Sequence, residues 1–302
     1  MKRLLLGVAA LLLSTNIYRT AEAEMVGALM PAKDIPYYVA IHESMTGELQ
    51  NLNARAEIVL QRPSPTVRAW SNATRKLVIL GSEVIVAYGS ATAICVGDEN
   101  ADIPVVYSGA YKPAGCGASG KVTGMESTLP LDGLVDNLKK ISGFSTLAIL
   151  YAGNEQGSVM QMEEAAALAA KAGAEVVKID VADSNSFDLP DVDAAFLTVA
   201  AAINQKENLE AIIKSARAKK IATASVLSGT CELGVLISLA ANPKHQGRGT
   251  AKMVAEILNG KSPKDIPPDK NPEAEMTINL KEAKELGFSV PFELLGTAKL
   301  VK

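Results

Sequence analysis

The stretch TLAILYAGNEQGSVMQMEEAAALAAKAGAEVVKID, residues 146–180, decides the fold class. It opens with an apolar, strand-like run at 146–151, followed by an alanine-rich amphipathic stretch at 157–172 that ends at Gly173. A second strand-like run follows at 175–180. A strand, a helix and a strand joined by short connections form a β-α-β unit, so we expect a parallel sheet with right-handed crossovers.

The same alternation extends in both directions along the chain. Upstream, strand-like runs at 24–30, 56–60, 84–87 and 105–107 alternate with helix-like stretches at 37–52, 71–80 and 89–101. Downstream lie strand-like runs at 194–199, 221–225 and 276–280, and helix-like stretches at 204–218, 247–259 and 281–287. The two series join near 122–131 and predict an α/β protein of two Rossmann-like lobes with parallel sheets. We expect one lobe to comprise residues 24–122 plus 238–275 and the other 127–236 plus 277–302.

The first 23 residues have the pattern of a signal peptide. Lys2 and Arg3 precede an apolar run at 4–13, and Ala21-Glu22-Ala23 forms a small-residue cleavage site. An apolar run of this length is too short for a membrane span, which needs about 20 residues. We therefore expect cleavage after Ala23 and a periplasmic location, with a buried N-terminal helix as the alternative interpretation.

Charge and composition exclude several classes of protein. The formal net charge is −3, and removing the +2 carried by residues 1–23 leaves −5. Such a chain has no basic footprint for nucleic acid. Aromatic residues make up 4% and hydrophobic residues 48%, which suits parallel sheets covered by alanine-rich helices.

Chemistry-bearing motifs are sparse. The three cysteines, Cys95, Cys116 and Cys231, form no CxxC pair, and a Cys95–Cys116 disulfide stays open. The chain has two histidines, so we expect neither metal nor redox cofactor. The run GCGASGK at 115–121 matches a phosphate-loop pattern but continues as extended chain, which favours a connecting loop. The acids Glu163 and Glu164 are expected on a solvated helix face, and no catalytic motif emerges.

Several local motifs resemble one known family. They are GRGT at 247–250, AEILNGKSP at 255–263, INLKEAKELG at 278–287 followed by Val290-Pro291, DIPVVY at 102–107, VTG at 122–124, and Leu150-Tyr151 with Glu155 and Ser158. Together they resemble the ABC-transporter substrate-binding proteins related to tryptophan- and tyrosine-type binding proteins, over residues 25–302. The resemblance implies a type I periplasmic-binding fold with three crossovers, a ligand in the cleft between the lobes, and an ABC permease as partner.

Candidate ligand-binding residues follow the strand ends, because open parallel sheets bind ligands beyond the carboxyl ends of their strands. They are Asp34, Ser90, Ser108, Tyr111, Lys112, Glu126, Asn154, Ser158, Thr198 and Ser225. The hydroxyls among them either orient a polar ligand or satisfy local backbone groups. Lys112 either neutralises an anionic ligand or is a solvated lysine.

The expected cleft departs from the family pattern at its acids. Tyr111-Lys112-Pro113 stands where relatives carry Thr-Asp-Pro, residues 197–200 replace Pro-Thr-Asp-Asn, Val226 replaces an Asp, and Glu126-Ser127 replaces Ser-Asp. A buried ammonium group needs a carboxylate partner, so the sequence disfavours an ordinary amino acid as ligand.

These patterns together predict an exported solute-binding protein. We expect a monomer that captures a small molecule for an ABC importer, closing by a hinge near 123–127, 236–240 and 276–279. The alternatives are a ligand-presenting sensor subunit that takes no part in import, and an exported enzyme.

Overall fold

The computed structural model describes residues 23–99, 102–113, 120–184 and 186–302. The expected signal peptide, apart from Ala23, lies outside these residues, as do Cys116 and most of the glycine-rich run at 115–121. Because Cys116 lies outside the described residues, its pairing with Cys95 stays a prediction. The Cys95 thiol lies 3.5 Å from the hydroxyl of Ser71. Among the described residues, no helix is long and apolar enough to cross a membrane.

The first lobe is built on a five-stranded sheet in the order β2-β1-β3-β4-β5, with every pairing parallel. Its strands are β1 (Glu24–Leu29), β2 (Ala56–Gln61), β3 (Val84–Tyr88), β4 (Val105–Ala110) and β5 (Val122–Glu126). Its helices are α1 (Pro36–Asn51), α2 (Val67–Ile79), α3 (Ser90–Glu99) and α9 (Pro243–Leu258). The strands β3 and β4 are buried along their whole length, because helices cover both faces of the sheet.

The second lobe contains a seven-stranded sheet in the order β12-β11-β10-β9-β8-β6-β7, in which only the β10–β11 pairing is antiparallel. Its strands are β6 (Thr146–Tyr151), β7 (Glu175–Asp180), β8 (Ala194–Leu197), β9 (Ala222–Ser225), β10 (Ile237–Ala240), β11 (Glu275–Asn279) and β12 (Lys299–Val301). Its helices are α4 (Leu131–Ser142), α5 (Gln156–Lys171), α6 (Ala201–Asn204), α7 (Lys206–Lys219), α8 (Thr230–Leu233), α10 (Leu280–Leu286) and α11 (Phe292–Leu295). A short 3₁₀ turn, η1 (Pro263–Asp265), precedes β11.

The expected α/β class with two parallel-sheet lobes is confirmed, with differences in detail. Two helices begin earlier than the apolar pattern indicated, because side chains cap them. Thr66 accepts the amide of Ala69 at the start of α2, and Asn242 accepts the amides of Lys244 and His245 at the start of α9. The helices α4, α8 and α11 and the strands β10 and β12 were not expected from the sequence patterns.

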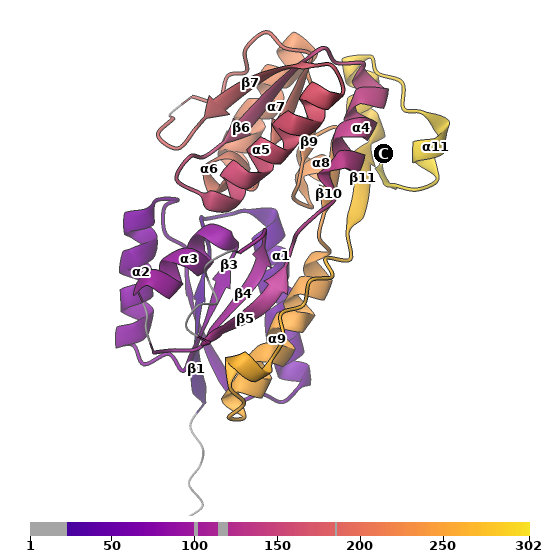
Figure 1. The fold of residues 1–302 in the computed structure, drawn as a ribbon. Helices are drawn as coiled ribbons and strands as arrows, with labels where there is room; N and C mark the ends of the chain where they lie inside the picture. Colours follow the sequence, from indigo (N-terminus) through magenta and orange to yellow (C-terminus); the bar gives the residue numbers. More distant parts are fainter. Residues whose placement is uncertain (1–22, 100–101, 114–119, 185) are drawn as a thin grey trace, which may run out of the picture.

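The chain passes between the lobes three times (Figure 1). It crosses from β5 to α4, from β10 to α9, and again from the segment after η1 to β11. Because β10 pairs within the second sheet, the second crossing follows Ala240, whereas the expected lobe boundary at 238 falls inside this strand. The exact lobe boundaries and the hinge segments stay predictions.

Candidate functional site

A small cavity lies where the two lobes meet. The first lobe contributes Pro31, Tyr38, Gly89, Ser90 and Ala91, and the second contributes Glu155, Gly157, Ser158 and Val199. All except Tyr38 follow a strand's carboxyl end or begin the next helix. The cavity measures about 10 Å³, which is room for about one water molecule.

The helix starts bring the lobes into close contact at this cavity. Gly89 has φ 83°, a left-handed conformation that suits glycine, and it turns the chain from β3 directly into α3. On the other lobe, a Cβ atom at Gly157 would lie 3.0 Å from the hydroxyl oxygen of Ser90. The absence of a side chain at Gly157 therefore lets α5 approach α3.

Glu155 is the buried acid of this site. It precedes α5, is 5% exposed, and its Oε1 accepts the Ala201 amide at 2.8 Å. Burial raises the pKa of Glu155 to about 7, and the Ala201 amide offsets part of that shift. Tyr38 of the first lobe is buried beside it, and its pKa is raised by burial and by the charge of Glu155. A carboxyl group with this pKa can accept or donate a hydrogen bond near neutral pH.

Two of the predicted site residues, Ser158 and Thr198, form a hydrogen bond with each other. Their hydroxyl oxygens lie 2.7 Å apart, Thr198 donates to the Leu150 carbonyl, and Ser158 accepts the Ala152 amide. These bonds join the ends of β6 and β8 to α5. The Ser158 side chain still borders the cavity, so the hydroxyl pair fixes the wall of the site.

The loop after β8 is held by two buried amide side chains that sequence reasoning did not select. Gln161 accepts the Val199 amide at 2.8 Å, and Asn204 donates to the carbonyls of Thr198 and Ala200. Gln161 Nε2 and Asn204 Oδ1 are buried and find no partner among the described residues. The loop that carries Val199 into the cavity is thereby fixed.

Ser90, Tyr111 and Lys112 lie on the first lobe's side of the contact. The Ser90 hydroxyl borders the cavity and donates to the Tyr111 carbonyl at 2.7 Å. The side chains of Tyr111 and Lys112 reach instead to Glu164 of α5, in the second lobe. Glu164 is therefore engaged in a contact, although the sequence indicated a solvated surface.

The other predicted site residues do not line the cavity. Asp34 and Asn154 are exposed, and Ser108 is buried under α9, where Thr250 donates to its hydroxyl at 2.6 Å. Ser225 is buried and accepts the Leu227 amide, and a Glu126 carboxylate oxygen lies 4.0 Å from the ammonium of Lys270. Their ligand-binding roles stay predictions.

Glu155 and Tyr38 are the two ionisable cavity residues that the sequence-based list of site residues omitted. Glu155 was noted only as part of a family-like motif, and its partner Ala201 lies 46 residues further along the chain. The replaced acids of the family pattern disfavoured an amino acid as ligand. Glu155 weakens that objection, because it is a buried carboxyl group that borders the cavity. A signal was present in the sequence: an acid in the short loop after a buried strand, directly before a helix.

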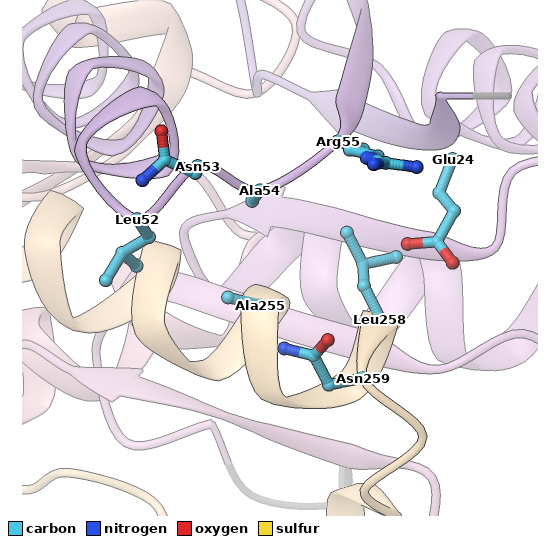
Figure 2. Close-up of a pocket in the computed structure, with 8 residues that line it drawn as sticks. All are labelled: Glu24, Leu52, Asn53, Ala54, Arg55, Ala255, Leu258 and Asn259. Carbon is cyan, nitrogen blue, oxygen red and sulfur yellow. The ribbon is translucent and has the colours of Figure 1, made fainter. Parts of the chain in front are cut away.

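Larger hollows lie away from the strand ends that face the other lobe. Figure 2 shows one of about 280 Å³, with Glu24 and Arg55 on one side, Leu52 on the other and α9 below. It lies at the amino-terminal ends of β1 and β2, opposite to where parallel sheets bind ligands. A second, of about 660 Å³, runs along α9 beside η1. Within the described ranges, no group of three His, Cys, Asp or Glu side chains could hold a metal ion.

A family model for ABC transporter substrate binding proteins matches residues 66–302. The chain belongs to the ABC transporter substrate-binding protein family. A search of curated proteins gives no significant match. The expected family and the type I periplasmic-binding fold are thus confirmed.

Solved structures of similar fold cover nearly the whole chain. A conserved domain protein from Vibrio cholerae has a TM-score of 0.86 at 21% identity, covering 93% of this chain and 100% of that one. The ABC domain from Streptococcus pneumoniae in complex with L-Trp has a TM-score of 0.85 at 23% identity, with the same coverage. The ligand-free, open substrate-binding protein CD0873 from Clostridium difficile has a TM-score of 0.64 at 20% identity, covering 92% and 99%.

Proposed function

We propose that this protein is a periplasmic solute-binding protein that captures a small molecule between its lobes and delivers it to an ABC permease. The observation that carries the proposal is Glu155, a buried carboxyl group on a cavity to which both lobes contribute. A ligand that contacts both walls has a differential affinity for the closed arrangement, which is how binding can drive closure. The family membership supports the role of the permease as partner.

The site's chemistry restricts the ligand. Glu155 has one carboxylate oxygen bonded to the Ala201 amide, and the other side chains around the cavity are hydroxyls, small apolar groups and Tyr38. We infer a small polar ligand that presents a hydrogen-bond donor or an amino group to Glu155. The L-Trp complex of the Streptococcus pneumoniae relative makes amino acids the first compounds to test.

Ligand entry requires the lobes to separate. The closed cavity has room for about one water molecule, so no organic ligand fits without movement of the walls. The three crossings between the lobes are the segments that can bend, as expected of hinge closure.

Native mass spectrometry of freshly purified protein tests the binding function. We expect a small molecule bound at one copy per chain, released on denaturation and retained less by Glu155→Gln than by Glu163→Gln, an exposed acid on α5. Binding of no compound from a panel of amino acids, sugars and organic acids would contradict the proposal. So would turnover of any of them.

Uptake measurements test the import role. Cells lacking this protein should take up the labelled ligand more slowly, and the wild-type gene should restore uptake. Unchanged uptake in the deletion strain would refute import and leave the sensor role.

A further inference from the structure

The groove of about 660 Å³ beside α9 lies in the first lobe, away from the cavity between the lobes. One wall is a single face of α9, whose residues recur at helical spacing: His245, Arg248, Gly249, Lys252, Met253 and Glu256. The other wall is the chain that follows α9 and runs back along it, Lys261 and residues 266–270 (Figure 1). A groove of this volume is large enough for a small organic molecule.

Hydrogen bonds to β5 fix the second wall of the groove. The Asp269 amide donates to the Gly124 carbonyl at 2.9 Å, and the Asp269 carbonyl accepts the Glu126 amide at 2.8 Å. The Thr123 hydroxyl donates to the Ile266 carbonyl at 2.7 Å. Both walls are therefore attached to the first sheet, and the groove keeps its shape whether or not the lobes move.

Two cations on the α9 wall have no ion-pair partner in the described part of the chain. Arg248 and Lys252 lie one helical turn apart, and both are exposed. Like charges four residues apart on a helix repel each other, so an anion bound beside them would relieve that repulsion. The whole chain has a formal net charge of −3, so this positive surface does not follow from a basic composition.

The two carboxylates that line the groove lie toward its ends and already have partners. Glu256 lies 2.5 Å from the ammonium of Lys261, and Asp269 Oδ2 lies 3.4 Å from Nε2 of His245. The middle of the groove, beside Arg248 and Lys252, is therefore the part where positive charge is left over.

Apolar side chains line the groove next to these cations. They are Met125, Met253, Ile266, Pro267 and Pro268. Methionine side chains adapt their shape to what they contact, and proline rings present a rigid apolar surface. An inorganic ion would leave this lining uncovered, whereas an organic anion would cover it and gain free energy from doing so.

We propose that this groove is a second binding site, for a small organic anion with an apolar body. Its carboxylate or phosphate group pairs with Arg248 and Lys252, since a guanidinium can hold either group through two parallel hydrogen bonds. Its apolar body lies against the methionines and prolines. The groove lies outside the cleft, so this anion and the transported ligand bind independently of the proposed transport function.

Isothermal titration calorimetry in a phosphate-free buffer of low ionic strength tests the site. The probes are phenyl phosphate and benzoate, which combine a ring with the two anionic groups. Inorganic phosphate and benzyl alcohol test the charge alone and the ring alone. The variants are Arg248→Gln and Lys252→Gln, and the control is Lys214→Gln, which removes an exposed lysine from α7 of the second lobe.

The expected result is that phenyl phosphate or benzoate binds at one copy per chain with a Kd below about 1 mM. Each groove variant should weaken that binding about tenfold, because a charge-assisted bond is lost, whereas Lys214→Gln should leave it unchanged. Which probe binds more tightly decides between a phosphate and a carboxylate as the anionic group.

Three results would overturn the site. They are saturation by neither organic probe, equal binding in wild type and both groove variants, and inorganic phosphate binding as tightly as phenyl phosphate. The last result would show a site for an ion only. Since Arg248 and Lys252 are exposed and lie far from the Glu155 cavity in the chain's other lobe, none of these results bears on transport.

Discussion

At the scale of single residues, Glu155 shows how burial sets chemistry. Its carboxyl group is placed between two lobes, next to Tyr38, and accepts a hydrogen bond from the Ala201 amide. Burial disfavours the charged form more than the amide stabilises it, so the pKa rises to about 7. The protonation state of such a carboxyl group changes with pH near neutrality, and it also changes when a ligand donates a hydrogen bond to the group.

The raised pKa of Glu155 predicts a loss of stability with pH. The folded protein holds this proton up to about pH 7, whereas the unfolded chain releases it near 4.5. Stability should therefore fall as pH rises from about 4.5 through 7. Glu155→Gln, which stays neutral, should be more stable than wild type by up to about 3 kcal/mol at pH 8 and equal to it near pH 4.5. Urea unfolding at both pH values measures this.

The matched control for this prediction is Glu163→Gln, an exposed acid on α5. It should change stability by less than about 0.5 kcal/mol at either pH. A stability difference for Glu155→Gln that is the same at both pH values would contradict the account of its burial.

At the scale of elements, the contact between α3 and α5 depends on the size of the residue at 157. A methyl group at Gly157 would press on Ser90, the first residue of α3, at 3.0–3.2 Å. Only a shift of one helix away from the other relieves that contact.

Gly157→Ala should weaken the closed arrangement of the lobes by about 1 kcal/mol. Amide hydrogen exchange at the starts of α3 and α5 should become about fivefold faster, as the lobes open more often. The control is Gly133→Ala in α4, where an added Cβ meets no atom within 4 Å and alanine favours the helix. Equal exchange in Gly157→Ala and wild type would show that this contact does not limit closure.

The helix α10 is attached to α7 through an ion pair. Arg217 donates to both carboxylate oxygens of Glu282, which is 2% exposed and whose amide is accepted by Asn279. Glu285 lies 3.8 Å from the same guanidinium but is half exposed.

Glu282→Gln should destabilise the protein by about 2 kcal/mol in urea unfolding, because it leaves the Arg217 charge without its bidentate partner. The value is below that of a fully buried pair because Arg217 is 41% exposed. Glu285→Gln should cost less than about 0.5 kcal/mol. Similar losses in both variants would contradict a special role for Glu282.

At the scale of the whole molecule, periodicity and strand composition were sufficient to predict two lobes. Strands such as β3 and β6 are continuous apolar runs, and these occur in sheets covered on both faces. The helix α4 has apolar residues at helical spacing, but its start lies at Pro130 and Leu131, where the two series were expected to join through a connection. The strand β10 has four residues, too few for a periodic signal.

The site was predicted less completely than the fold, because its contacts join distant parts of the chain. Glu164 meets Lys112 from 52 residues away, and Glu155 meets Ala201 from 46. Helical spacing alone places Glu164 on a solvated face. The strand-end rule found Ser90 and Ser158 on the cavity but could not separate them from Ser108, which packs under α9.

The most direct test of the central claim is a crystal structure of the protein with the compound identified by native mass spectrometry. We predict the ligand between the lobes, contacting Glu155 from the second lobe and the Ser90 region of the first. A ligand bound to one lobe only, or in the hollow between Glu24 and Asn259 shown in Figure 2, would contradict it.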